Sequence, residues 1–113
     1  MTLYFTNAQM IDPEAGTVTR GTLQVEGTRI AAILPDGAPI PGDADSIDCR
    51  GKYLAPGIVD LGVKVCEPGE RHKESFRSAG LAAAAGGVTT MVTRPDTTPA
   101  IDNPEVLEFV TRR

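Results

Sequence analysis

The sequence contains no tryptophan, one histidine and two cysteines, and aromatic residues make up 4% of its 113 positions. So few aromatic side chains argue against a surface that stacks bases. The 15 acidic residues exceed the 11 basic ones, and the basic residues form no stripe, which disfavours nucleic-acid binding. The two cysteines, Cys49 and Cys66, are too few for a disulfide framework and lack the C-x-x-C spacing of zinc sites.

Long hydrophobic runs are also missing. The longest uncharged stretch, residues 78–93, is too short and too rich in glycine, alanine and threonine to span a bilayer. No basic residue precedes the first apolar run, unlike the pattern of a secretory signal peptide. We therefore expect a cytoplasmic protein with reduced thiols that binds neither a membrane nor nucleic acid.

The first half of the sequence has the pattern of short strands separated by turns. Residues 3–5 are apolar and aromatic, and residues 12–16 carry the proline and glycine of a turn. Residues 22–26 alternate in polarity, and a Gly-Thr pair separates them from the apolar residues 29–33, which predicts a hairpin. A loop rich in proline and glycine follows at 35–41. We expect an all-β segment here.

In the second half, two strands alternate with two helices. The largely apolar residues 58–65 are typical of a buried strand, and residues 88–93 have the pattern of a second strand. A helix is expected from about Lys73 to Ala85, with Glu74 in its first turn and a Gly-Gly pair after its end. Asn103, followed by a proline, has the pattern of a helix N-cap. This order predicts two units of a parallel α/β architecture.

Two such units cannot close a barrel, which takes eight units and about 250 residues. A lone parallel strand pair also leaves open edges. We therefore expect the chain to be a part of a longer polypeptide, with a small self-contained α+β domain as the alternative.

Several motifs resemble those of the dihydroorotases, in the amidohydrolase superfamily. That family reads Pro-Gly-x-x-Asp-x-His-x-His, then Leu-Arg-Glu-Pro-Gly, a Lys-Glu helix start, Ala-Gly-Gly-x-Thr and Pro-Asn-Thr. The matching segments in this sequence are Pro56-Gly57-Ile58-Val59-Asp60, Glu67-Pro68-Gly69, His72-Lys73-Glu74, Ala85-Gly86-Gly87-Val88-Thr89 and Pro95-Asp96-Thr97, with Asp48-Cys49-Arg50-Gly51-Lys52 upstream. Dihydropyrimidinases match less well, because they lack the Glu-Pro-Gly and Pro-x-Thr pair in this form.

The resemblance implies an α/β fold in two parts. Residues 1–55 would form the N-terminal half of a small β-sandwich. Residues 56–113 would form the first two β/α units of a metal-dependent-hydrolase TIM barrel, which is incomplete in this chain. Both expectations agree with the pattern of strands and helices.

The family's functional positions carry unusual residues in this sequence. Dihydroorotases bind zinc through the paired histidines at the end of the first barrel strand, where residues i and i+2 point the same way. Gly62 and Lys64 occupy these positions; glycine has no ligand, and a protonated lysine has no free lone pair. Cys66 replaces the arginine that pairs with the substrate carboxylate, and Asp96 replaces a substrate-binding asparagine.

We therefore predict that this segment holds no catalytic residue, no metal ligand and no confident substrate-binding residue. No cofactor is expected from the segment itself, although zinc would remain if ligands beyond residue 113 persist. Lys64 either fills a disused site or acts as an internal cation that replaces the metal and holds acids such as Asp60, which has an equally good structural role. His72 is expected to be exposed and non-catalytic, rather than a lone ligand or the partner of a Cys66 nucleophile. Cys49 is expected to be a small core residue.

The resemblance and these departures predict an inactive dihydroorotase-like protein of pyrimidine biosynthesis. In the family, such proteins are structural partners of aspartate transcarbamoylase in a larger oligomeric assembly. The alternative is an active dihydroorotase, or another zinc-dependent cyclic amidohydrolase, that uses ligands beyond residue 113. A third hypothesis is a small binding module, which requires the natural chain to end at Arg113.

Overall fold

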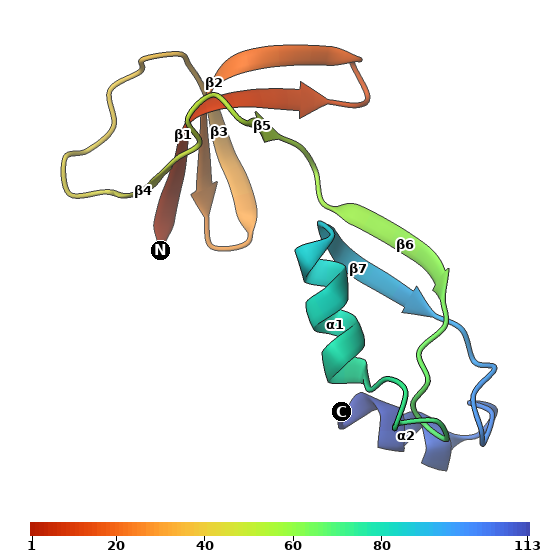
Figure 1. Ribbon diagram of the computed structural model, residues 1–113. Coiled ribbons are helices and arrows are strands. Elements are labelled where there is room, and N and C mark those ends of the chain that lie inside the picture. Colours follow the sequence, from red (N-terminus) through yellow and green to blue (C-terminus); the bar gives the residue numbers. More distant parts are fainter. The chain divides into compact units, whose positions relative to one another are not determined.

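The computed structural model describes all residues from Met1 to Arg113. They form two compact units, Met1–Pro56 and Gly57–Arg113, here called the N-terminal and C-terminal units (Figure 1). The first contains only strands, and the second alternates strands with helices. The expected change from an all-β segment to a β-α-β-α segment is therefore confirmed.

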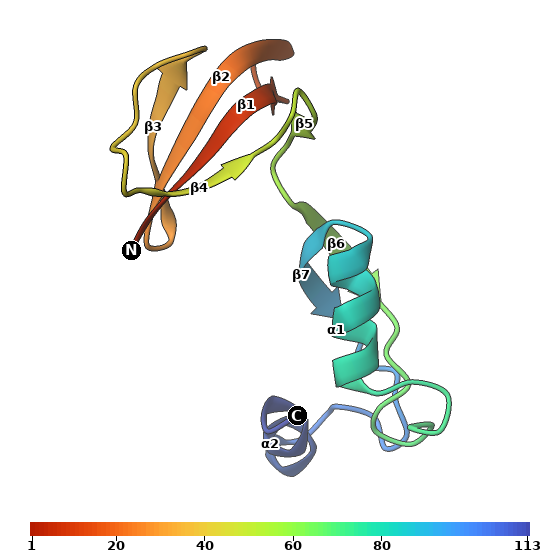
Figure 2. The same ribbon diagram turned by 60° about the vertical axis from the view of Figure 1, so that its left-hand side comes forward.

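The N-terminal unit is a single mixed sheet. Its strands are β1 (Thr2–Asp12), β2 (Thr17–Glu26), β3 (Arg29–Pro35), β4 (Asp45–Asp48) and β5 (Tyr53–Leu54). The strand order is β3-β2-β1-β4, and β5 also pairs with β1. The first three strands are antiparallel, whereas β4 and β5 run parallel to β1 (Figure 2).

Both turns expected in this unit are present. The Asp12 carboxylate accepts hydrogen bonds from the backbone amides of Glu14 (3.0 Å) and Ala15 (3.1 Å), which fixes the turn between β1 and β2. The second hairpin pairs Glu26 with Arg29 across a two-residue turn. The predicted hairpin is therefore confirmed.

The parallel pairing of β4 and β5 with β1 was not expected. An extra residue in β1 shifts its register between Phe5 and Ala8, and Asn7 within this bulge has a φ of +52°. The Asn7 side chain donates to the Asp48 carboxylate at 2.9 Å, and the Asn7 carbonyl accepts from Gly51 N at 2.8 Å. The bulge therefore fits the bend between β4 and β5.

The buried side chains of the N-terminal unit are few and lie on β1 and β2: Tyr4, Ala8, Met10 and Thr22. A groove of about 380 Å³ lies on one face of the sheet. Its lining includes Leu23, Ile30, Ile33 and Leu54, and the two isoleucines are largely exposed. One face of the sheet thus presents apolar side chains to solvent. Cys49, expected in the core, is half-buried in the bend after β4, because that bend lies at the edge of the sheet.

The C-terminal unit consists of β6 (Ile58–Val63), α1 (Phe76–Ala85), β7 (Val88–Thr93) and α2 (Pro104–Thr111). The strands β6 and β7 pair in parallel, and α1 contacts β7 (Figures 1 and 2). This is one strand–helix–strand unit followed by a second helix. Neither helix is both long and apolar enough to cross a bilayer.

The start of α1 differs from the prediction. The helix begins at Phe76 rather than near Lys73, because Ser75 is the N-cap. The Ser75 hydroxyl accepts from Ser78 N at 3.2 Å, and the Ser78 hydroxyl accepts from Ser75 N at 2.9 Å. This reciprocal capping box places Glu74 before the helix. The predicted end at Gly86 and the predicted Asn103 N-cap of α2 are confirmed.

The sequence predicted that strand β6 is buried, and this prediction is wrong. Val59 and Leu61 are 59% and 74% exposed. Parallel strands usually carry apolar residues on both faces because other layers cover them, and within this unit no such layer covers these side chains. Burial begins after the strand, at Val65 and Glu67.

We predict that Asn7→Gly raises the pKa of Asp48 toward its ordinary value. The hydrogen bond from Asn7, together with that from Arg50 N, lowers the pKa of Asp48. Glycine accepts the positive φ but lacks the amide donor. Carboxyl-detected NMR titration measures the change. Asn103→Gly, which removes a similar contact with Asp102, should leave the pKa of Asp48 unchanged; equal effects of the two variants would contradict the prediction.

Candidate functional site

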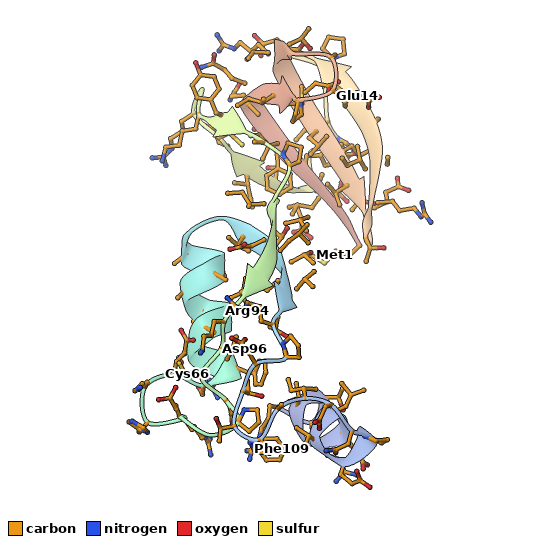
Figure 3. The ribbon with its side chains drawn as sticks, turned by 90° about the vertical axis from the view of Figure 1, so that its right-hand side faces the viewer. Met1, Glu14, Cys66, Arg94, Asp96 and Phe109 are labelled. Carbon is orange, nitrogen blue, oxygen red and sulfur yellow. The ribbon has the colours of Figure 1, made fainter.

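The residues at the family's functional positions lie where β6 and β7 end. Gly62 is near the end of β6, and Lys64 and Cys66 follow that strand. Arg94 and Asp96 follow β7, and both are labelled with Cys66 in Figure 3. The carboxyl ends of parallel strands meet at one edge of a sheet, which is the usual place of active sites in α/β proteins.

Gly62 interrupts the regular geometry of β6. Leu61 pairs with Val92 and Val63 with Thr93, so Gly62 is the extra residue of a bulge. Its φ is +86°, a region that favours glycine. The strand predicted over residues 58–65 ends at Val63, so Lys64 lies beyond its end, and the bulge at Gly62 interrupts the strand repeat before it.

Three charged side chains converge at this edge. Lys64 Nζ lies 3.8 Å from Asp96 Oδ2, and Arg94 donates to the same oxygen at 2.7 Å. We call Lys64, Arg94 and Asp96 the charged triad. All three are about half exposed. Lys64 therefore has an acidic partner, as the internal-cation hypothesis requires, but that partner is Asp96 and not Asp60.

Backbone hydrogen bonds fix the loop that carries the triad. Arg94 N donates to Val63 O at 2.8 Å, which joins the ends of the two strands. Thr97 N and Ile101 N both donate to Pro95 O, at 2.9 and 3.0 Å. Asp96 therefore lies between anchored residues, and its position does not depend on the ion pairs alone.

The loops after β6 and β7 also pack against each other. Thr98 N donates to Pro68 O at 3.3 Å. A Cβ at Gly69 would overlap the carbonyl of Thr98, and Gly69 has a φ of +107°. The Glu-Pro-Gly motif thus allows a close approach of the two loops.

Cys66 and His72 are not linked to each other in this structure. The Cys66 thiol is half-buried, and no hydrogen bond joins it to His72. His72 is exposed, as expected, but it lies in a turn before α1 rather than at the helix start.

Glu70 and Lys73, on either side of His72, form an ion pair. The hydrogen bond from Lys73, and then its charge, lower the pKa of Glu70. The same hydrogen bond raises the pKa of Lys73.

Glu67 is buried and makes several contacts, although the sequence indicated only that it is part of a turn. Its side chain is 3% exposed. One oxygen accepts from Phe76 N, the first amide of α1, at 3.0 Å. The other lies 3.5 Å from Arg71 Nε and 3.4 Å from Arg113 Nε without meeting hydrogen-bond geometry. The spacing of Glu67 and Arg71 by four residues was the available signal for an ion pair.

No three His, Cys, Asp or Glu side chains gather in this chain as a metal site would require. Asp60 lies exposed on β6 and makes no side-chain hydrogen bond or ion pair. The residues at the strand ends therefore offer ionic contacts and one thiol. They can bind charged groups and hold the two loops together.

Comparison with solved structures defines the class of fold. The L-hydantoinase (dihydropyrimidinase) from Arthrobacter aurescens is 26% identical to this chain and superimposes with a TM-score of 0.81. The match covers 95% of this chain and 24% of the hydantoinase. The chain thus has a mixed α/β fold similar to part of an amidohydrolase.

Comparison of sequences narrows the class to a family. The Dihydro-orotase-like family profile matches residues 51–113. The dihydroorotase of Wolbachia sp. subsp. Drosophila simulans (strain wRi) is 40% identical over 96% of this chain, and that of Anaplasma phagocytophilum (strain HZ) is 41% identical over 99%. The chain spans about a quarter of the length of these relatives, 25% and 26%. It belongs to the dihydroorotase-like family.

We predict that Gly62→Ala lowers the free energy of unfolding by about 1–2 kcal/mol, because a Cβ disfavours positive φ. The space itself is open, since a Cβ would meet only Arg94 Cγ at 4.0 Å. Chemical denaturation of the protein at its natural length measures the effect. Gly80→Ala in α1, where a Cβ meets nothing, should stabilise by about 0.5–1 kcal/mol. Effects of the same sign would contradict the backbone argument.

We predict that Glu67→Gln lowers the free energy of unfolding by about 1–3 kcal/mol, because the amide loses both arginine contacts while it can still accept from Phe76 N. Denaturant unfolding gives this value. The control is Glu74→Gln in the same unit, where no ion pair or hydrogen bond is present, and its effect should stay within about 0.5 kcal/mol. A Glu67→Gln effect no larger than that of the control would show that the contacts are not stabilising.

Proposed function

We propose that this dihydroorotase-like chain is catalytically inactive and serves pyrimidine biosynthesis as a structural partner of aspartate transcarbamoylase. In this proposal, residues 1–55 are the N-terminal half of a β-sandwich and residues 56–113 are the first two units of a TIM barrel. The protein works in the cytoplasm as part of an oligomeric assembly.

The charged triad is the observation that carries the loss of activity. Family enzymes place a zinc ligand at each of the positions of Gly62 and Lys64. Here one position has no side chain and the other holds an ammonium group 3.8 Å from Asp96. A unit charge about 4 Å from a divalent ion costs about 2 kcal/mol even in water. These residues do not fit zinc, so no catalytic step through zinc is assigned to them.

The substrate side of the site supports the same proposal. A guanidinium can pair with a carboxylate through two hydrogen bonds, but Cys66 provides only a thiol in its place. Asp96 adds a negative charge where the family binds an anionic substrate. Four functional positions are thus unsuited at once, which favours loss of the reaction over exchange of one ligand.

The structural partnership is proposed from the family resemblance and the loss of chemistry together. The inactive members of the family hold transcarbamoylase subunits in a larger assembly. A protein that keeps this fold without its metal ligands fits such a role.

An active cyclic amidohydrolase is the second candidate. The relatives that are about 40% identical are described as dihydroorotases, which favours an enzyme. This candidate requires zinc ligands beyond residue 113 that suffice without the first-strand pair.

The test is zinc content of the natural-length protein, purified without chelators, together with dihydroorotate hydrolysis after zinc is added. We expect zinc far below one ion per chain, no hydrolysis, and co-elution with aspartate transcarbamoylase on size exclusion. The Wolbachia dihydroorotase, purified in the same way, is the control for metal retention. Stoichiometric zinc with turnover would establish the second candidate and overturn the first; loss of co-elution alone would overturn only the partnership.

A further inference from the structure

We propose that the side chain of Asp96 acts as an internal anionic ligand for two neighbouring cations. Its carboxylate occupies a site between Lys64 and Arg94 that would otherwise bind a small oxyanion, such as a carboxylate or a phosphate. The inference goes beyond the proposed function and does not rest on it, because it requires neither the loss of zinc nor the partner protein.

The geometry of the cations is the first argument. Lys64 and Arg94 follow different strands, yet both direct a nitrogen to the same oxygen of Asp96, at 3.8 and 2.7 Å. Two cationic nitrogens that reach one oxygen atom can also contact one external oxyanion. Charge-assisted hydrogen bonds from such groups are the strong contacts of carboxylate and phosphate sites.

Solvent accessibility distinguishes the cations Lys64 and Arg94 from the two arginines that contact Glu67. Glu67 also contacts two arginines, but its carboxylate is only 3% exposed. In the charged triad, the side chains of Lys64 and Arg94 are each 53% exposed and that of Asp96 is 41% exposed. A diffusing anion can therefore reach the nitrogens of the triad and cannot reach the carboxylate position at Glu67.

The hydrogen bonds that anchor the loop after β7 explain why the Asp96 carboxylate binds the two cations in preference to a free anion. Thr97 N and Ile101 N hold Pro95 O, and Arg94 N holds Val63 O, so the residues on both sides of Asp96 are fixed. A tethered group has an effective concentration in the millimolar range or above. A free anion at lower concentration does not displace it, and the site stays closed to small oxyanions.

The test is binding of inorganic phosphate and of acetate to the natural-length protein and to Asp96→Asn, followed by titration with NMR detection of the lysine and arginine side chains. The variant keeps the size of the side chain and removes its charge. We expect both anions to bind about tenfold more tightly to the variant. Asp102→Asn is the matched control, because Asp102 is an exposed aspartate of the same unit that contacts only Asn103, and it should not change either affinity.

A second variant tests whether the tighter anion binding depends on Lys64. Asp96→Asn combined with Lys64→Ala should return both affinities to the wild-type level, because one cation alone holds the anion weakly. If circular dichroism shows that Asp96→Asn is misfolded, Asp96→Ser replaces it. Equal binding by wild type and variant, tighter binding of only one anion, or a double variant that binds as tightly as Asp96→Asn would each overturn the proposal.

Discussion

The buried carboxylate of Glu67 is the constraint on which the C-terminal unit depends. An ionised group taken out of water is costly unless other charges and donors compensate for it. Here the compensation comes from the first amide of α1, from Arg71 in the following turn and from Arg113 after α2. The loop after β6 cannot move without separating these contacts. Since Lys64 and Cys66 lie at the start of that loop, the buried carboxylate also fixes where the candidate site lies.

The charged triad has a different physical character. Half-exposed ion pairs contribute about 0–1 kcal/mol to stability, because solvent and salt screen them. Stability alone therefore gives little reason for Lys64, Arg94 and Asp96 to meet at one point. The occupation of the site proposed above explains the contacts better, because the carboxylate of Asp96 satisfies both cations. The carboxylate of Glu67 is therefore buried, and that of Asp96, on the neighbouring loop, is partly exposed.

Local chemistry made part of this structure predictable. The hairpin turn at Gly27 and the Asn103 N-cap depend on residues within four positions of each other, and both are confirmed. The pairing of β4 with β1 joins residues about forty positions apart, and no local pattern encodes it. The apolar residues of β6 correctly indicated a strand. The prediction that these residues are buried was wrong. Hydrophobic residues indicate that a strand is suited to packing against other layers, but no such layer covers β6 within this unit. At the site, residue identities alone predict that Gly62 and Lys64 are unsuited to metal, whereas the bulge and the Asp96 partner depend on pairing between strands.

The proposed loss of zinc chemistry has two separate parts, the backbone of β6 and the side chains at the strand ends. Restoring a histidine at position 64 would supply a ligand, but a histidine at position 62 would have to adopt a φ of +86°, which costs about 1–2 kcal/mol for a residue with a Cβ. Arg94 and Asp96 would still remain at the same strand ends, as a cation and an anion that contact each other. Under the proposed function, a return to zinc binding would therefore need new side chains and would also meet this cost in the backbone of β6. A single lost ligand would be reversible by one substitution, whereas a bulge and an internal ion-pair cluster together support the proposal that the fold has a structural role.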